Sequence, residues 1–225
     1  MGGAHFLKLM QLGDSALPSG GYAFSNGLES AHKSGVVPDA EVFETCLIDQ
    51  LFQLRMGELP FIHSCYTPAT LDEDSFVDLA AYYDAMQLVP AIRRASVVLG
   101  RNWLRLMGQF SDSQDVGIYG EWLTQAGLSA HLTPLFGATM RATGLSEEEA
   151  KLLFCHQFVR DQVSSAVRLS IVGPMEATRI HRNVLPACDD LMQDTIPYQE
   201  ASRWLPRWDI AQCQHDQLYT RLFQN

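Results

Sequence analysis

Apolar residues recur along nearly the whole chain at the spacing that places them on one face of a helix. Runs that alternate apolar and polar residues, as half-buried strands do, are almost absent. The pattern predicts helices at 5–13, 25–34, 39–66 with a break at Pro60, 72–88, 91–108, 117–126, 132–143, 147–172, 175–192 and 199–222. We therefore predict an all-α fold, a single-domain bundle that spans residues 1–225.

Capping residues support several of these boundaries. Ser146 and Glu149 have the spacing of a capping box, in which a side chain at each position binds the backbone N–H of the other. Thr70 and Glu73 have the same spacing and predict a second box. Gly144 follows a predicted helix at the position where left-handed backbone ends it.

Composition and charge exclude several classes of protein. Acidic residues number 26 and basic residues 16, for a net charge of -10, and no Lys/Arg run offsets this charge. Such a chain repels nucleic-acid phosphates. No apolar stretch is long enough to span a bilayer, and the five widely spaced cysteines are typical of reduced thiols. We expect a cytoplasmic protein that binds neither nucleic acid nor membrane.

Motifs of catalytic and metal-binding sites are absent from the sequence. It has no G-x-S-x-G elbow, no C-x-x-C and no H-E-x-x-H. We therefore expect no catalytic residue, no fixed metal site and no cofactor. Two alternatives stay open: a standalone metal-dependent helical enzyme with a pocket of scattered His, Cys and Asp side chains, and a plain structural helical protein.

The stretch "DSALPSGGYAFSNGLES" is an unusual turn between two predicted helices. A phosphate-binding loop is disfavoured because the motif lysine and the preceding strand are missing. Two interpretations remain. The stretch is either a structural corner, in which Pro18 fixes the backbone, or a surface that a partner protein binds. If it is only a corner, Tyr22 should be buried.

Two further segments have a pattern typical of docking surfaces. The helix predicted at 91–108 carries four arginines in an acidic chain, which form either a solvated face or a docking face for an acidic partner. The C-terminal segment ends in apolar residues at helical spacing, which either join the protein's own core or fill a partner's groove.

The turn and its flanks, "LMQLGDSALPSGGYAFSNGLESAHKSGVV", closely resemble the N-terminal signature of the urease accessory protein F (UreF) family. Further matches follow in the family's order: "RRASVVLGRNWLRL", "HLTPLFGATMRATGL", "SSAVRLSIVGPMEATRIH" and the closing "HDQLYTRLFQN". Together they extend the resemblance from Phe6 to Asn225.

The resemblance implies an all-α homodimer without an active site of its own. UreF-like proteins work with a second accessory protein, UreD (also called UreH), and with the GTPase UreG, in a complex that delivers nickel to apo-urease. They are regarded as regulators of the GTPase, by analogy with GTPase-activating proteins, and as part of a conduit for nickel. Nickel would thus be handled transiently by the complex and not held as a cofactor.

The resemblance also implies two partner-binding sets. The set that faces the GTPase comprises Gly20, Gly21, Tyr22, Ser25, Gly27, Glu29 and Arg168. The set that binds the UreD/UreH-type protein lies in the docking segment at about 205–225 and comprises Tyr219, Arg221, Leu222 and Phe223.

Within the first set, Tyr22 would be an aromatic anchor and Glu29 would pair with a partner's Lys or Arg. An arginine that acts on the GTPase would have to be exposed. The possible residues are Arg93, Arg94, Arg101 and Arg168.

Overall fold

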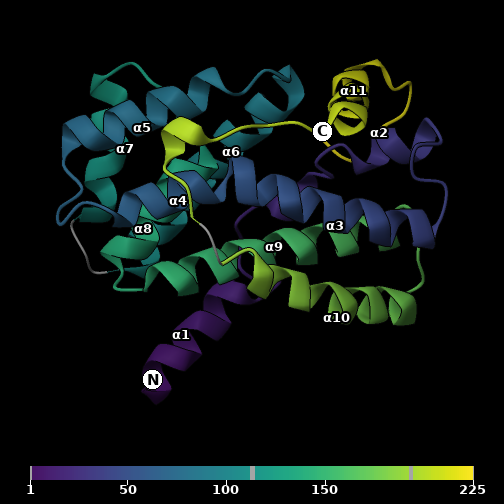
Figure 1. Cartoon of the computed structure of the whole chain (residues 1–225), viewed down its shortest axis with the longest axis horizontal. Helices are drawn as coiled ribbons and strands as arrows, with labels where there is room; N and C mark the ends of the chain where they lie inside the picture. The colour runs from purple at the N-terminus through teal and green to yellow at the C-terminus, as the bar shows by residue number, and fades with distance from the viewer. Residues whose placement is uncertain (1, 112–114, 193–194, 225) are drawn as a thin grey trace.

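The computed structural model describes residues 2–111, 115–192 and 195–224. Within these ranges the regular secondary structure consists of eleven α-helices and three short 3-10 helices, without a strand. Figure 1 shows the helices packed into one bundle, from which α1 (Gly3–Gly13) projects. The predicted all-α fold is confirmed.

The remaining elements follow closely on one another along the chain. They are η1 (Gly21–Ala23), α2 (Leu28–Lys33), α3 (Ala40–Gly57), α4 (Leu59–Tyr66), α5 (Glu73–Ala85), α6 (Pro90–Phe110), α7 (Asp115–Gln125), α8 (Leu132–Ala142), α9 (Glu147–Arg168), α10 (Pro174–Asp190), η2 (Tyr198–Glu200), α11 (Pro206–Gln214) and η3 (His215–Gln217). The break predicted at Pro60 is confirmed, since α3 ends at Gly57 and Pro60 lies in the first turn of α4.

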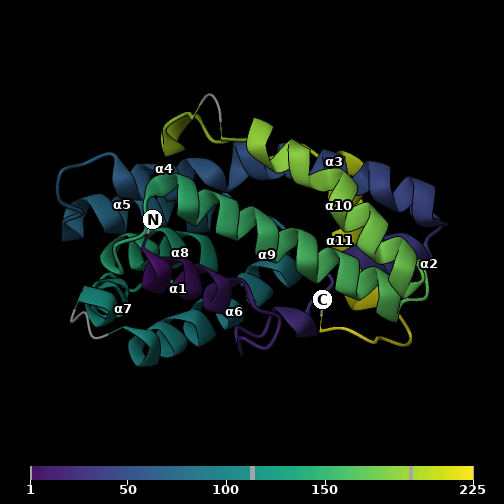
Figure 2. The same ribbon diagram turned by 90° about the horizontal axis from the view of Figure 1, so that it is seen from below.

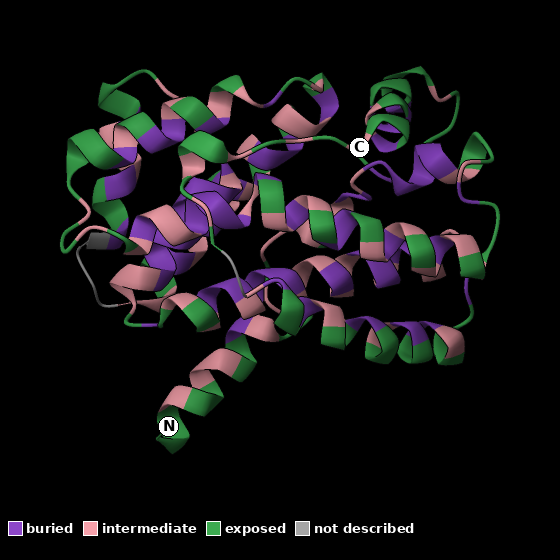
Figure 3. Cartoon of the chain, in the orientation of Figure 1, coloured by how far each residue is buried: buried purple, intermediate pink, exposed green. Residues whose placement is uncertain are grey.

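The core is built around α8 and α9. Every residue of α8 from Thr133 to Met140 is buried, and α4 and α6 pack on it. Figure 2 shows α9 crossing the middle of the molecule, where it contacts α1, α2, α3, α4, α8 and α10. The surface helices α3 and α10 expose their outer faces, as Figure 3 shows. In the ranges that the structure describes, no helix is both long and apolar enough to cross a membrane.

A glycine permits the close approach of α6 to the turn before α8. A Cβ atom on Gly100 would lie 2.1 Å from the carbonyl oxygen of Ala130, which is far inside van der Waals contact. The helix can therefore pack at this depth only without a side chain at position 100.

Helix ends test the capping predictions. The Ser146 side chain accepts the N–H of Glu149, whose carboxylate accepts the N–H of Ser146 in turn, so this capping box is confirmed. Gly144 has a φ of 80°, which confirms its place after α8. The box predicted at Thr70 is wrong. Asp72 caps α5 instead, because its short carboxylate reaches the N–H of Ser75 at 2.9 Å.

The last predicted helix, at 199–222, is also largely wrong. Only α11 and the short η3 form within it, because Pro206 cannot continue a helix and instead occupies the first turn of α11. After Gln217 the chain is not helical and turns back, so that the C-terminus lies beside α2 and α11 (Figure 1). We call residues 218–224 the tail.

Candidate functional site: a surface formed by both ends of the chain

The turn singled out in the sequence, residues 18–27, packs tightly against α9 and α11; we call it the corner. Gly20 and Gly27 have φ angles of 93° and 91°, a backbone region that glycine adopts without strain. A Cβ on Gly21 would lie 2.2 Å from Oδ2 of Asp161, and one on Gly27 would lie 2.5 Å from Cγ of Gln212. These glycines thus set the position of the corner.

Side chains from α9 and α11 hold the backbone of the corner. The carbonyl oxygen of Asn26 accepts hydrogen bonds from Trp208 Nε1 at 2.9 Å and Gln212 Nε2 at 3.2 Å. The carbonyl oxygen of Ser25 accepts one from Gln162 Nε2 at 3.0 Å. Buried carbonyl groups are satisfied in this way, so the corner is rigidly connected to the rest of the fold.

Glu29 lies in α2, directly after the corner, and its side chain is fully buried. The carboxylate pairs with Lys33 at 2.7 Å, one helical turn further on. It also accepts the backbone N–H groups of Leu222 at 2.8 Å and Phe223 at 3.0 Å. Glu29 therefore binds the protein's own tail, and it is not available in this conformation to pair with a partner's Lys or Arg.

Arg168, at the end of α9, lies between the corner and the tail. Its guanidinium carbon is 3.7 Å from the ring centroid of Tyr22 and 4.1 Å from that of Phe223, and the group donates a hydrogen bond to the carbonyl oxygen of Tyr22. Beside it, the N–H of Gln224 donates to the carbonyl oxygen of Ala23 at 2.9 Å. Stacking on two rings and the hydrogen bond fix the guanidinium in one position.

The groups that surround Glu29 favour its charged form. Burial raises the pKa of Glu29, but the Lys33 ammonium and the N–H groups of Leu222 and Phe223 together lower it below its ordinary value of 4.5. The fully buried His215 lies in η3, just before the tail. Burial lowers the pKa of His215 below 6.5, and the charge of Arg221 adds to this effect. The effect is opposed by the carboxylates of Glu29 and Asp216 and by the Phe223 backbone.

The corner and the tail together present an exposed surface. Tyr22 is 66 % exposed, and Tyr219, Arg221 and Leu222 are exposed as well. By contrast, Ser25, Gly27, Glu29 and Phe223 are buried and support the surface from below. A corner without a binding role should bury Tyr22, whereas here the ring lies in solvent on a rigid base.

The structure brings together two residue sets that the sequence analysis had assigned to different partners. The contacts Glu29–Phe223 and Tyr22–Arg168–Phe223 join them into one surface, which we call the corner–tail surface. Sequence reasoning missed Lys33, although its place four residues after Glu29 is the usual spacing of a helical ion pair. It also missed Gln162 and Gln212, for which the sequence gives no local signal.

The four arginines considered for an action on the GTPase differ in their surroundings. Arg93 pairs with Asp84 at 2.7 Å and Arg94 with Asp216 at 2.5 Å. Arg101 is exposed on α6, whereas Arg168 is partly buried between its two rings. Arg94 and Arg101 are therefore the most accessible of the four.

The corner–tail surface presents aromatic and aliphatic side chains, the guanidinium groups of Arg168 and Arg221, and the backbone of the tail. Among the residues placed by the structure, no group of three or more His, Cys, Asp or Glu side chains is arranged to hold a metal ion.

Comparison with known proteins identifies the family. The family model UreF matches residues 37–185, which is more than half of the chain. A urease accessory protein UreF of Trichodesmium erythraeum is 30% identical over 229 residues, covering 97% of this chain and 96% of the relative. That of Methylobacillus flagellatus is 28% identical and covers 97% of each, and urease accessory protein F of Oryza sativa subsp. indica is 29% identical over 95% of this chain and 82% of its own. The chain belongs to the UreF family of urease accessory proteins.

Proposed function

We propose that the protein is a non-catalytic adaptor in the activation of urease. It joins a UreD/UreH-type accessory protein and the UreG GTPase in one complex that delivers nickel to apo-urease, and it modulates the activity of the GTPase. Nickel is the cargo of this complex. Membership of the UreF family supports the assignment to urease maturation.

The observation that carries the proposal is the rigid, exposed Tyr22 ring beside the tail. Arg168 stacks on the ring and the corner is hydrogen-bonded to α9 and α11, so little side-chain entropy remains to be lost on binding. A fixed, exposed aromatic side chain is a typical anchor of a protein–protein interface.

The tail forms the second part of this surface. Tyr219 and Leu222 are exposed, and the tail is attached through a few contacts that include Glu29 and Lys33. We assign the tail to the UreD/UreH-type protein and the corner, with Tyr22 and Arg168, to the GTPase. The working form of the protein in this proposal is a homodimer.

Size-exclusion chromatography with light scattering tests the proposal. The full chain would be run alone, with the UreD/UreH-type protein, and with UreG added. A second sample would be truncated after Asp216, which removes the tail. We expect a dimer that joins both partners and a truncated chain that loses the UreD/UreH-type protein. A monomer that binds neither partner would contradict the proposal.

A pair of substitutions tests whether UreG binding depends on the corner itself or on any exposed apolar residue. Tyr22→Ala removes the ring and should weaken the joining of UreG, whereas Met175→Ala, on the exposed side of α10, should leave it unchanged. Both variants should keep the helical circular dichroism of the full chain. Equal binding by the two variants would exclude Tyr22 as a contact.

A further inference from the structure

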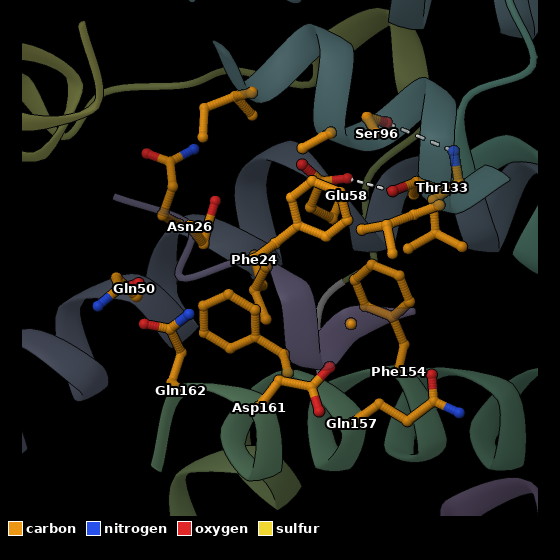
Figure 4. Close-up of a pocket in the computed structure, with 18 of the residues that line it drawn as sticks. Phe24, Asn26, Gln50, Glu58, Ser96, Thr133, Phe154, Gln157, Asp161 and Gln162 are labelled. Atoms are coloured by element: carbon orange, nitrogen blue, oxygen red, sulfur yellow. Dashed lines mark hydrogen bonds between the residues drawn. The ribbon is translucent and has the colours of Figure 1, made fainter. Parts of the chain in front are cut away.

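A cavity of about 200 Å³ lies directly behind the corner. The corner forms one wall, and α3, α6, α9 and the segment from Arg203 to Gln212 form the others. Figure 4 shows Phe24 of the corner reaching into this space from one side, with Phe154 and Asp161 of α9 beside it. Elements from both halves of the chain therefore line the cavity.

Most of the cavity wall is apolar and much of it is aromatic. The aromatic side chains in the wall are Phe24, Tyr83, Trp103, Phe154, Phe158 and Trp208. An apolar cavity of about 150 Å³ is already large enough to bind benzene in a protein core. This cavity can thus take the body of a small aromatic or branched aliphatic molecule.

Two buried amide oxygens in the cavity wall have no hydrogen-bond partner within the described parts of the chain. The Nε2 of Gln50 donates to the carbonyl oxygen of Cys46 at 3.3 Å, and that of Gln162 donates to Ser25. Because carbonyl oxygens only accept, these bonds fix the orientation of both amides. The Oε1 atoms of Gln50 and Gln162 remain as unpartnered acceptors, and both side chains are more than nine-tenths buried. A ligand that donates hydrogen bonds would satisfy them.

A carboxylate adds negative charge to the same cavity. Figure 4 shows Asp161 and Gln162 in its wall, with their side chains directed to different parts of the cavity. Arg160 binds Asp161 only through Oδ1, at 2.8 and 2.9 Å, while Oδ2 lies against Gly21. Burial raises the pKa of Asp161, although Arg160 and His156 oppose this effect. A second cation near Oδ2 would therefore stabilise the carboxylate.

Of the other charged residues in the wall, Glu58 and Arg203 are paired with each other, whereas Asp209 is a second carboxylate. Glu58 accepts hydrogen bonds from Arg203, from Tyr83 at 2.8 Å and from Thr133 at 2.5 Å. The Glu58–Arg203 pair contributes little net charge, so Asp161 and Asp209 set the sign of the cavity. An anionic ligand would meet two carboxylates and two acceptors, whereas the faces of the aromatic rings attract cations.

We propose that this cavity binds a small organic amine in its protonated form. The apolar body of the ligand packs against the aromatic wall, its ammonium group donates to Gln50 and Gln162, and the negative charges of Asp161 and Asp209 in the same cavity favour the protonated form. Since the corner is one wall of the cavity, the bound amine would also stabilise the corner that carries Tyr22. The inference does not depend on the proposed function in urease activation.

Calorimetric titration of the full chain with three small probes tests the inference. Benzylamine carries the ammonium group, toluene has a similar apolar body without a donor, and benzoate has the opposite charge. We expect saturable binding of benzylamine that is at least about tenfold tighter than that of toluene, and no binding of benzoate. Absence of benzylamine binding, equal affinity for toluene, or binding of benzoate would each overturn the proposal.

Two substitutions locate the site. Asp161→Asn keeps the size of the side chain and removes its charge, so benzylamine affinity should fall at least about tenfold while toluene binding stays the same. Asp74→Asn, on the exposed side of α5, is the matched control and should change nothing. Leu99→Trp fills the cavity from α6 and should abolish the binding of both probes. Unchanged benzylamine affinity in Asp161→Asn would overturn the proposal even if Leu99→Trp fails to fold.

Discussion

The carboxylate of Glu29, near the N-terminus, accepts the backbone N–H of Phe223 at the C-terminus at a distance of 3.0 Å. The same carboxylate binds Leu222 and Lys33, so one buried side chain connects α2 with the tail. A negative charge is stable in this position because an ammonium group and two N–H groups surround it. The backbone of the tail and the buried Phe223 ring thus attach the tail to the fold, while Tyr219, Arg221 and Leu222 stay exposed.

Glu29→Gln is expected to destabilise the protein by about 1–3 kcal/mol. Both carboxylate oxygens of Glu29 accept hydrogen bonds, and the amide of Gln would replace one of these acceptors with an N–H donor. Urea unfolding followed by circular dichroism measures the loss. Glu121→Gln, at an exposed position of α7, is the control and should stay within about 0.5 kcal/mol of the parent. A loss no larger than that of the control would mean that Glu29 does not stabilise the fold.

The stabilisation by Glu29 should depend on pH in a definite direction. Its folded-state pKa is lowered below 4.5, so the contribution is complete above that value and is lost as the pH falls through the folded pKa. The difference in unfolding free energy between the parent and Glu29→Gln should therefore be constant near neutral pH and shrink in acid. A difference that grows on acidification would contradict the assigned charge.

His215 should make the protein less stable in mild acid. Burial lowers its pKa below 6.5, so the unfolded chain takes up the proton first and stability falls as the pH drops through 6.5. His215→Phe removes this titration and should reduce the slope of unfolding free energy against pH, while other histidines preserve part of it. If the variant has the same slope as the parent, His215 is not the group responsible.

Two glycines of α6 should respond to alanine in opposite directions. At Gly100 a Cβ would collide with the carbonyl oxygen of Ala130, so Gly100→Ala should destabilise by about 2 kcal/mol or more. At Gly108 nothing lies within 4 Å, so Gly108→Ala should stabilise by about 0.5–1 kcal/mol through helix propensity. Thermal unfolding of both variants provides the comparison, and equal shifts would contradict the close packing at Gly100.

Most of the fold could be predicted from the sequence because helix periodicity and capping are local properties. Ser146 and Gly144 mark their helix ends as expected, whereas Thr70 and the helix at 199–222 do not. The second failure arose because apolar spacing near the C-terminus continued past η3, while the tail is fixed by Glu29, which is far away in the sequence.

The residues of the candidate site could be predicted from the sequence, but their spatial arrangement could not. The family motifs pointed to Tyr22, Arg168 and Phe223 separately, and nothing local indicates that Arg168 stacks on both rings. A glutamate in a polar context is normally exposed, so its burial beneath the tail could not be foreseen. Contacts between residues that are remote in sequence decide both features.

The central claim is that the corner and the tail act as one binding surface, and a double-mutant cycle tests it most directly. The experiment measures how tightly the parent, Tyr22→Ala, Phe223→Ala and the double variant each bind the complex of UreG with the UreD/UreH-type protein. Both rings pack on Arg168. We therefore predict that the loss of binding free energy in the double variant differs from the sum of the two single losses by at least about 0.5 kcal/mol. Additive effects, or unchanged affinity in both single variants, would contradict a single surface.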